Sequence, residues 1–206
     1  MTRKVYDRAY FDRWYRDPRW RVGSRGELRR KVAVAVALAE FHLERPLTNV
    51  LDVGCGEAPW RAELRRLRPG IEYLGLDSSE YVVSRYGRQR DIRLARFADL
   101  AELRFERRFD LIVCSDVLHY LPAAEIRRGL TGFGELLQGV AFLEVFTRSD
   151  ATVGDNAGYI ARPPRWYWNA FAATGLIPCG NSTWVSPLVP RPVSAMERCP
   201  TPLMLR

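Results

Sequence analysis

The stretch VLDVGCGEAPW, residues 50–60, governs how the rest of the chain is interpreted. An apolar, strand-like run ends at Val53, and Gly54 and Gly56 follow with one residue between them. Glycines at this point let the backbone turn sharply and approach a ligand without a Cβ in the way. We therefore expect a ligand at the carboxyl end of this strand. A pyrophosphate is disfavoured, because Ala58-Pro59 stands where a dinucleotide fingerprint has its third glycine.

Length and charge limit the classes that need to be considered. The 206 residues, 47% of them hydrophobic and 27% charged, suit one globular domain. The net charge of +8 arises from 32 basic and 24 acidic residues, and the basic surplus lies within residues 1–108. This asymmetry suits an anionic partner such as nucleic acid, or a chain that uses arginine in place of lysine throughout. The second interpretation is favoured because no dense basic tract occurs.

Targeting and cysteine patterns give the expected compartment. No apolar run approaches the ~20 residues that cross a bilayer, and the start MTRKVYDRAYFDRWYR has no apolar segment of signal-peptide type. We expect a cytoplasmic protein without membrane contact. The cysteines form no CxxC pair, so neither a disulfide framework nor a metal site is predicted.

The N-terminal segment is predicted to have a role of its own. Tyr6, Tyr10 and Trp14 recur at four-residue spacing, which indicates an aromatic stripe on one helical face. We expect residues 1–24 to form a helical lid segment and residues 25–206 to form the main domain.

Downstream of residue 24, helical and strand-like stretches alternate. A helix is predicted over residues 25–44, where Arg45-Pro46 ends the pattern. The apolar strand-like runs that follow are NVLDV, EYLGLD, IRLARF, FDLIVCS and VAFLEVF. Strands buried on both faces and separated by helices indicate a mostly parallel sheet in a doubly wound α/β fold.

The last third departs from this alternation. RPPRWYWNAFAATGL predicts a turn and one more helix, and STWVS and SAMERC (182–186 and 194–199) are strand candidates joined by PLVPRP. Two strands joined without room for a helix should pair antiparallel. The predicted fold is therefore a Rossmann-like, doubly wound, seven-stranded sheet, mostly parallel with an antiparallel C-terminal strand pair.

Two acidic residues follow the next strands. Asp77, at the end of YLGLD, lies 21 residues after Gly56, and a carboxylate there can accept hydrogen bonds from both hydroxyls of a ribose. The alternative is helix capping, because Asp77 and Glu80 fit the D-x-x-E form of a capping box. Asp99, in FADLAEL, can accept from an adenine amino group, and with Glu102 it also fits a capping box.

A fourth strand ends in FDLIVCSDVLHYLP and delivers Ser115 and Asp116 to the same edge. Together, the segments LDVGCGEA, GLDSS, FADL, FDLIVCSDVLHYL and FLEVF resemble, in order, the class I S-adenosylmethionine-dependent methyltransferase family. The resemblance covers roughly residues 28–199. Joint occurrence is far more specific than any single motif. The resemblance implies S-adenosyl-L-methionine as cofactor and a small-molecule acceptor methylated on oxygen or nitrogen.

The resemblance also implies roles for individual residues. Asp52, Gly54 and Gly56 would surround the methionine part of the cofactor, and Asp77 the ribose. The full set of predicted cofactor-binding residues is Asp52, Gly54, Cys55, Gly56, Asp77, Ser78, Asp99, Leu100, Cys114 and Ser115.

The predicted acceptor side lies past the fourth and fifth strands. His119 is the first candidate for a general base, and the alternative is a packing or cofactor-flanking histidine. The catalytic candidates are His119, Asp116 and Tyr120. Aromatic residues of the segment after the fifth strand and of the lid would hold the acceptor, although such residues also serve as core. The predicted substrate-binding residues are Tyr10, Trp14, Tyr159 and Trp166.

Three other functions remain open. An RNA methyltransferase agrees with the basic first half, but there is no N-P-P-Y or D-P-P-Y after the fourth strand and no RNA-binding module. A catalytically silent, cofactor-binding subunit has the same motifs. A nicotinamide-dependent dehydrogenase is opposed by the missing third glycine and by Asp99. We expect a monomer or homodimer, with nucleic acid disfavoured as partner.

Overall fold

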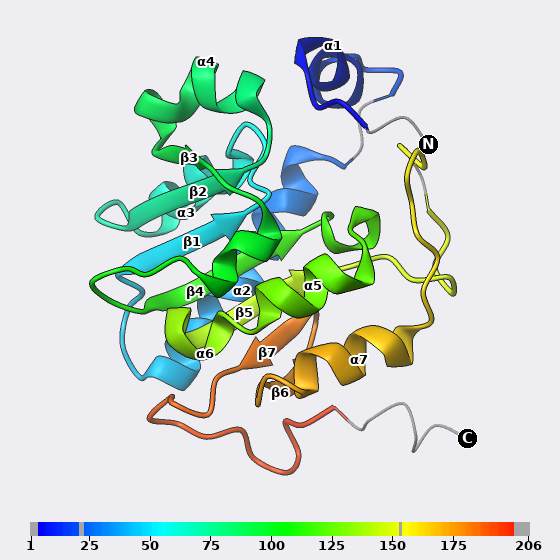
Figure 1. Ribbon diagram of the computed structural model, residues 1–206. Helices are drawn as coiled ribbons and strands as arrows, with labels where there is room; N and C mark the ends of the chain where they lie inside the picture. The colour runs from blue at the N-terminus through cyan, green and yellow to red at the C-terminus, as the bar shows by residue number, and fades with distance from the viewer. Residues whose placement is uncertain (1–3, 21–22, 153, 200–206) are drawn as a thin grey trace.

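The protein, described from a computed structural model over residues 4–20, 23–152 and 154–199, is built on one twisted sheet (Figure 1). The spatial order of the seven strands is β3-β2-β1-β4-β5-β7-β6. The first five strands run parallel, and β7 pairs antiparallel with both β5 and β6. The strands are β1 (Asn49–Val53), β2 (Glu72–Asp77), β3 (Ile92–Leu94), β4 (Phe109–Ser115), β5 (Leu137–Glu144), β6 (Ile177–Gly180) and β7 (Thr183–Val185).

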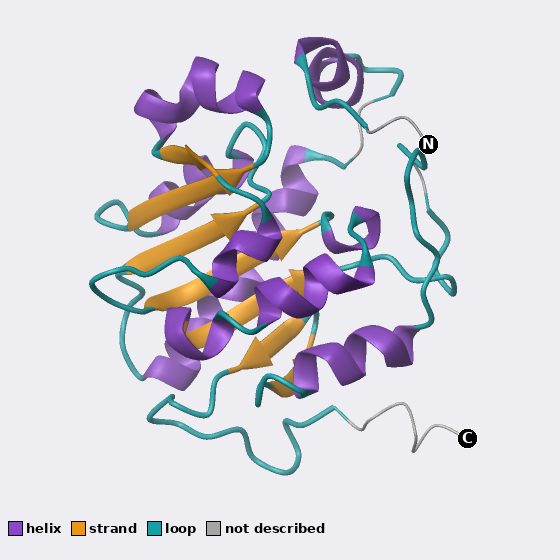
Figure 2. Ribbon diagram, in the orientation of Figure 1, coloured by secondary structure: helices purple, strands orange, loops and turns teal. Residues whose placement is uncertain are grey.

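Helices cover both faces of the sheet, as Figure 2 shows. Along β4 the side chains alternate, with Leu111 and Val113 in one hydrophobic core and Ile112 and Cys114 in the other. The first core lies against α2 (Arg25–Leu43), α3 (Pro59–Leu67) and α4 (Glu80–Arg90). The second lies against α5 (Ala123–Leu130), α6 (Phe133–Leu136) and α7 (Pro164–Ala172). Burial on both faces explains why the strand sequences are continuous apolar runs.

The topology fixes where a ligand can bind. From β1 the chain passes to β2 and β3 on one side, and then crosses to β4 and β5 on the other. In such open α/β sheets, ligands bind outside the carboxyl ends of the strands at this point of reversal. The loops after β1 and β4 therefore border the expected crevice.

The C-terminal strand pair exists, but one of its two predicted members was wrong. STWVS contains β7, whereas SAMERC forms a turn in which Ser194 N donates to Glu197 Oε2 at 2.8 Å. The partner of β7 is β6, which precedes it across the turn at Asn181-Ser182. SAMERC has no apolar face to bury, since Met196 is 96% exposed. The strand predicted over IRLARF is shorter than expected and ends at Leu94.

The N-terminal aromatic stripe does not continue along one helical face. α1 (Arg8–Phe11) is followed by the π-helical turn η1 (Asp12–Arg16), in which the Asp17 N–H bonds to the Asp12 carbonyl five residues back. This turn holds more residues than an α-helical turn, so four-residue spacing no longer keeps side chains on one face; Trp14 packs against Trp20. Tyr15 contacts Phe11 instead, with ring centroids 5.1 Å apart.

The described part of the chain contains no helix with the length and apolar character that a bilayer span requires.

Candidate functional site

The loop after β1 turns on two glycines with positive φ. Gly54 has φ +71° and Gly56 has φ +53°, a region that other residues enter only under strain. The N–H groups of Gly54 and Cys55 donate to the Leu76 carbonyl at 2.7 and 3.1 Å, which fixes the loop on the end of β2. A Cβ on Gly54 would lie 2.4 Å from Val117 Cγ2, so a side chain does not fit at this position.

Asp77 joins this loop to β2. Its Oδ2 accepts from Gly56 N at 2.7 Å and its Oδ1 accepts from Ser79 N at 2.8 Å. The side chain is 8% exposed, and burial raises the pKa of Asp77 while the backbone donors act in the opposite direction. The N-cap of α4 is Ser79, whose Oγ accepts from Val82 N at 3.2 Å. The capping role considered for Asp77 thus belongs to Ser79, and Asp77 remains an acceptor beside the glycine loop.

Asp52 supports the loop from below. It is 2% exposed and accepts a hydrogen bond of 2.7 Å from the Tyr73 hydroxyl on β2. Burial raises the pKa of Asp52 to about 7, and the nearby negative charge of Asp77 acts in the same direction. This residue therefore contacts the neighbouring strand rather than an open surface.

The predicted adenine position lies in η2 (Phe97–Ala101), the turn after β3. Asp99 Oδ2 accepts from Arg96 N at 2.8 Å, so this carboxylate does cap its own turn, without Glu102. The Asp99 side chain is exposed, and Leu100 is fully buried in the second core.

The carboxyl ends of β4 and β5 are tied together by polar side chains. Ser115 Oγ donates to Glu144 Oε2 at 2.5 Å, and Lys31 Nζ of α2 lies 2.7 Å from Glu144 Oε1. Cys114, one residue earlier, is fully buried, and burial raises the pKa of its thiol. The Cys114 side chain therefore cannot contact a ligand at this edge, and only the backbone of this residue can.

Asp116 and His119 form a pair after β4. Asp116 has φ +63°, which is unusual for a residue with a side chain and holds its backbone in the left-handed region. His119 Nε2 lies 3.1 Å from Asp116 Oδ1, and His119 Nδ1 accepts from Phe146 N at 3.3 Å. Because Nδ1 is an acceptor here, the N–H of the ring is at Nε2, which donates a hydrogen bond to Asp116 Oδ1. His119 is 1% exposed, whereas the Asp116 side chain is about half exposed.

Aromatic rings surround His119. The Tyr120 ring centroid lies 4.3 Å from that of His119, and the Tyr159 ring lies at 5.6 Å. The Ile160 N–H donates to the His119 carbonyl at 2.8 Å and so fixes the segment after β5 against this turn. The buried Tyr159 hydroxyl has no hydrogen-bond partner among the described residues.

Two of the four predicted substrate-binding residues lie apart from the others. Trp166, on α7, stacks with Arg162, whose guanidinium carbon is 4.7 Å from its ring, and packs against the second core. Trp14 contacts Trp20 and Arg13. Tyr10 and Tyr159 lie closer to the His119-Tyr120 turn. Lys4 Nζ contacts the rings of both Tyr10 and Tyr120, and the Tyr159 ring lies beside His119.

The sequence reasoning missed how closely the N-terminal segment covers the glycine loop. A Cβ built on Gly56 would lie 3.4 Å from Phe11 Cε1 and 3.6 Å from the Tyr15 hydroxyl. Phe11 also stacks on Tyr81 of α4 at 5.8 Å, and Ser79 Oγ donates to the Tyr6 carbonyl at 2.5 Å.

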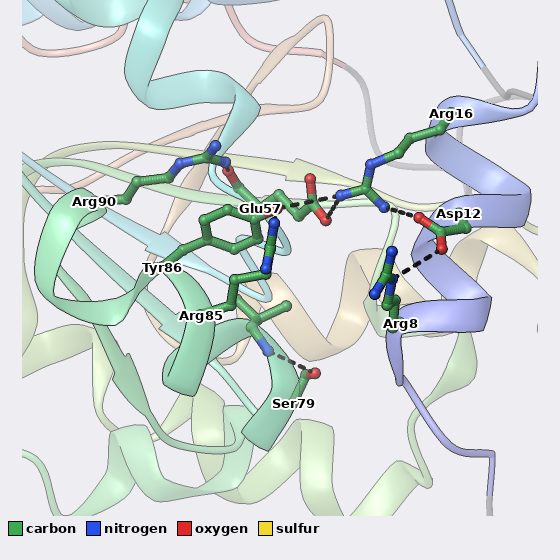
Figure 3. A network of polar contacts seen from close by, with 9 residues as sticks. Arg8, Asp12, Arg16, Glu57, Ser79, Arg85, Tyr86 and Arg90 are labelled. Carbon is green, nitrogen blue, oxygen red and sulfur yellow. Dashed lines mark hydrogen bonds and ion pairs between the residues drawn. The ribbon is translucent and has the colours of Figure 1, made fainter.

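A charged network fixes the same segment in place (Figure 3). Arg16 extends from η1 to form an ion pair with Glu57, the residue after the second glycine, and also bonds to Asp12 Oδ1 at 2.6 Å. The Tyr86 hydroxyl on α4 accepts a hydrogen bond from Arg16 at 3.3 Å. The guanidinium carbon of Arg90 lies 3.9 Å from the centroid of the Tyr86 ring. Two features of the sequence could have indicated this network: Glu57 directly after the second glycine, and the four-residue spacing of Asp12 and Arg16.

A separate cavity of about 310 Å³ lies beyond β5, against α7 and the β6-β7 turn. Its lining includes Thr147, Asp150, Trp168 and Trp184 and no residue of the glycine loop. It therefore lies apart from the glycine loop after β1.

Comparison with known proteins agrees with this geometry. Residues 51–140, from β1 to β5, match the family model described as a methyltransferase domain. This part of the chain is therefore similar to a methyltransferase domain. Over 87 residues the chain is 34% identical to trans-aconitate 2-methyltransferase of Deinococcus radiodurans, a match that covers 38% of this chain and 30% of that relative.

Solved structures share the fold of this domain at low sequence identity. A sugar N-methyltransferase from Streptoalloteichus sp. superposes with a TM-score of 0.62 at 17% identity, covering 93% of this chain and 95% of that one. A SAM-dependent methyltransferase from Archaeoglobus fulgidus gives 0.59 at 14% identity, covering 82% and 73%. An amino pentose methyltransferase from Micromonospora echinaspora gives 0.60 at 18% identity, covering 90% and 98%. The predicted fold class is confirmed, and the family model and the curated relative agree with the predicted family.

Proposed function

We propose that this protein is an S-adenosylmethionine-dependent methyltransferase that methylates an oxygen or nitrogen of a small-molecule acceptor. The observation that carries the proposal is the contact between Gly56 N and Asp77 Oδ2 at the carboxyl edge of β1 and β2. It sets an acceptor-only carboxylate beside a loop with glycines at two of its positions, at the point where the strand order reverses. When bound, the cofactor supplies an electrophilic methyl group on a sulfonium cation.

The residues of the crevice fit such a cofactor. Asp77 retains lone pairs for ribose hydroxyls after its two backbone contacts. The two glycines have positive φ and carry no side chain, so a ligand can approach the backbone here once the covering segment moves aside. The residues proposed to hold the cofactor are those predicted above, with Asp52 acting through the strand pair and Cys114 through its backbone.

The chain's own residues would orient the methyl donor and the acceptor, exclude water from the site and supply a proton acceptor. We propose residues 1–24 as the lid, of which 4–20, 23 and 24 are described, because Phe11 and Tyr15 cover the glycine loop. Exclusion of water strengthens charge interactions in the site and keeps donor and acceptor in near-attack geometry. Asp116 is the exposed carboxylate that could take a proton from an acceptor, and buried His119 orients it. The role of general base, predicted first for His119, is therefore proposed for Asp116 and His119 acting together.

A small-molecule acceptor is supported by the relatives, whose names specify trans-aconitate, a sugar and an amino pentose. The aromatic rings of Tyr120 and Tyr159 at the crevice suit a small acceptor more than a polymer.

The test is a screen of small acceptors with S-adenosylmethionine, in which formation of S-adenosylhomocysteine is measured. Sugar amines, simple amines, carboxylic acids and phenols cover the proposed oxygen and nitrogen nucleophiles. Acceptor-dependent product formation supports the proposal. Tight cofactor binding without turnover on any acceptor would favour the silent-subunit alternative.

A further inference from the structure

One lysine side chain lies inside a group of aromatic rings at the edge of the crevice. Lys4 Nζ is 4.0 Å from the ring centroid of Tyr120, 5.2 Å from that of Tyr10 and 5.3 Å from that of Tyr6. It also forms an ion pair with Asp155. All three ring distances are within the range in which an aromatic face attracts a cation. We call Tyr6, Tyr10, Tyr120 and Asp155 the ammonium cage.

The cage is shielded from solvent and built from separate parts of the chain. The side chains of Lys4 and Asp155 are 18% and 11% exposed, so the cation is largely desolvated. The Tyr120 hydroxyl donates to the Asp155 carbonyl at 2.6 Å, and the rings of Tyr6 and Tyr10 meet edge to face at 5.0 Å. These contacts fix the walls without help from Lys4. The tyrosine walls stay neutral, since burial raises the pKa of Tyr6 to about 12 and also raises that of Tyr120.

The cage borders both halves of the proposed active site. On the cofactor side, the Tyr6 carbonyl accepts from Ser79 Oγ, two residues from Asp77. On the acceptor side, Tyr120 follows His119 and stacks on it at 4.3 Å. A cationic group in the cage therefore lies between the residues assigned to the cofactor and those assigned to the acceptor.

The type of cation in the cage is informative. The chain contains 30 arginines and only two lysines, Lys4 and Lys31. A compact ammonium can approach three ring faces at once, whereas a guanidinium is planar and stacks on one. The cage thus has the shape and charge of a site for an ammonium group.

We propose that the ammonium cage binds the protonated or quaternary amino group of a small amine, and that Lys4 occupies it as an internal substitute. The proposal deepens the proposed function, on which it rests, by naming an amine as the class of acceptor or product. An acceptor bound as its ammonium form must lose that proton, for which Asp116 is the proposed base, before its nitrogen takes the methyl group; a quaternary ammonium can only be the product. Lys4 lies in the lid segment, before α1, so its withdrawal would open the cage to a ligand.

The test uses choline and its neutral carbon isostere 3,3-dimethyl-1-butanol as probes, with binding followed by calorimetry or ligand-detected NMR. The proteins are the wild type, Lys4→Ala, and the matched control Arg8→Ala, which removes a cation 76% exposed on the same segment. We expect Lys4→Ala to bind choline at least ~10-fold more tightly than the wild type, because the internal competitor is gone. Arg8→Ala should behave like the wild type.

Selectivity and a second variant complete the test. Lys4→Ala should bind the neutral isostere at least ~10-fold more weakly than choline, and Lys4→Ala/Tyr120→Leu should lose the choline gain. Choline binding that Lys4→Ala does not improve, or that the isostere matches, would overturn the proposal. Because these probes are measured without S-adenosylmethionine, the cage can fail while cofactor binding succeeds, and the reverse result is equally distinguishable.

Discussion

Gly56 and Asp77 are joined by a hydrogen bond of 2.7 Å from the backbone N–H of one to the carboxylate of the other. The bond connects the loop after β1 with the end of β2, 21 residues later. The same carboxylate thus fixes the loop through Gly56 N and holds the start of α4 through Ser79 N, at 2.8 Å. This double use explains why the acid stands at the strand end while Ser79 caps the helix.

Asp77→Asn should weaken binding of S-adenosylhomocysteine by about 1.5 to 3 kcal/mol, measured by calorimetry. The amide cannot accept on both sides, so it loses either the loop contact or a ribose contact. Asp99→Asn, in the exposed cap of η2, is the comparison variant and should cost less. Normal cofactor affinity in Asp77→Asn, accompanied by a loss of thermal stability, would indicate a structural role only.

His119→Ala and Asp116→Asn should each lower kcat by about 100-fold for an acceptor that must lose a proton, with little change in cofactor affinity. If His119 acts by orienting Asp116, the double variant should lose no more than either single one. Losses that multiply would show independent roles. A parallel loss of S-adenosylhomocysteine binding in His119→Ala would place this histidine in the cofactor site.

The buried Asp52 predicts a pH dependence of stability. Its pKa of about 7 in the folded protein means that, between about pH 4 and 7, the folded state keeps a proton that the unfolded chain releases. The free energy of unfolding should therefore fall as pH rises through this window, by up to about 1.4 kcal/mol per pH unit. Asp52→Asn keeps an acceptor for Tyr73 and should remove this contribution.

Urea unfolding of wild type and Asp52→Asn at pH 4, 5.5 and 7 measures the difference directly. The variant should gain on the wild type as pH rises, because the shared contribution of Asp77 cancels in the comparison. Parallel pH profiles would mean that Asp52 is ionised in the folded protein throughout.

The lid contact through Arg16 should affect ligand exchange more than stability. Arg16→Ala removes the ion pair with Glu57 and should speed dissociation of S-adenosylhomocysteine by up to about 5-fold, since an exposed pair is worth at most about 1 kcal/mol. Stopped-flow displacement measures the rate. Arg8→Ala, whose partner Asp12 lies in the lid itself, should leave it unchanged. An equal effect of both variants would contradict a closing role for the Glu57 contact.

Much of the fold was predictable because long, apolar, doubly buried strands leave a strong pattern. NVLDV and FDLIVCS coincide with β1 and β4 at both ends, and the helix predicted from Arg25 ends one residue earlier than expected, at Leu43. The failures lie where local signals are weak. β6, whose sequence IPCG contains proline and glycine, is a strand only because β7 offers its edge.

The site was predictable where spacing follows from the topology and hidden where it depends on side-chain packing. The positions of Gly54, Gly56 and Asp77 follow from a strand, a turn and the next strand. The placement of Tyr15 over the loop depends on a π-helical turn, which four-residue spacing cannot reveal. The cage around Lys4 joins the lid to residues more than 100 positions away, and so required the tertiary structure.

Calorimetric titration of the wild-type protein with S-adenosylhomocysteine, with NAD as the control ligand, decides whether the residues at the ends of β1 and β2 form a site for S-adenosylmethionine. We expect one site with micromolar-range affinity, a matching rise in melting temperature through mass action, and no response to NAD. Binding of NAD with no response to S-adenosylhomocysteine would contradict this expectation.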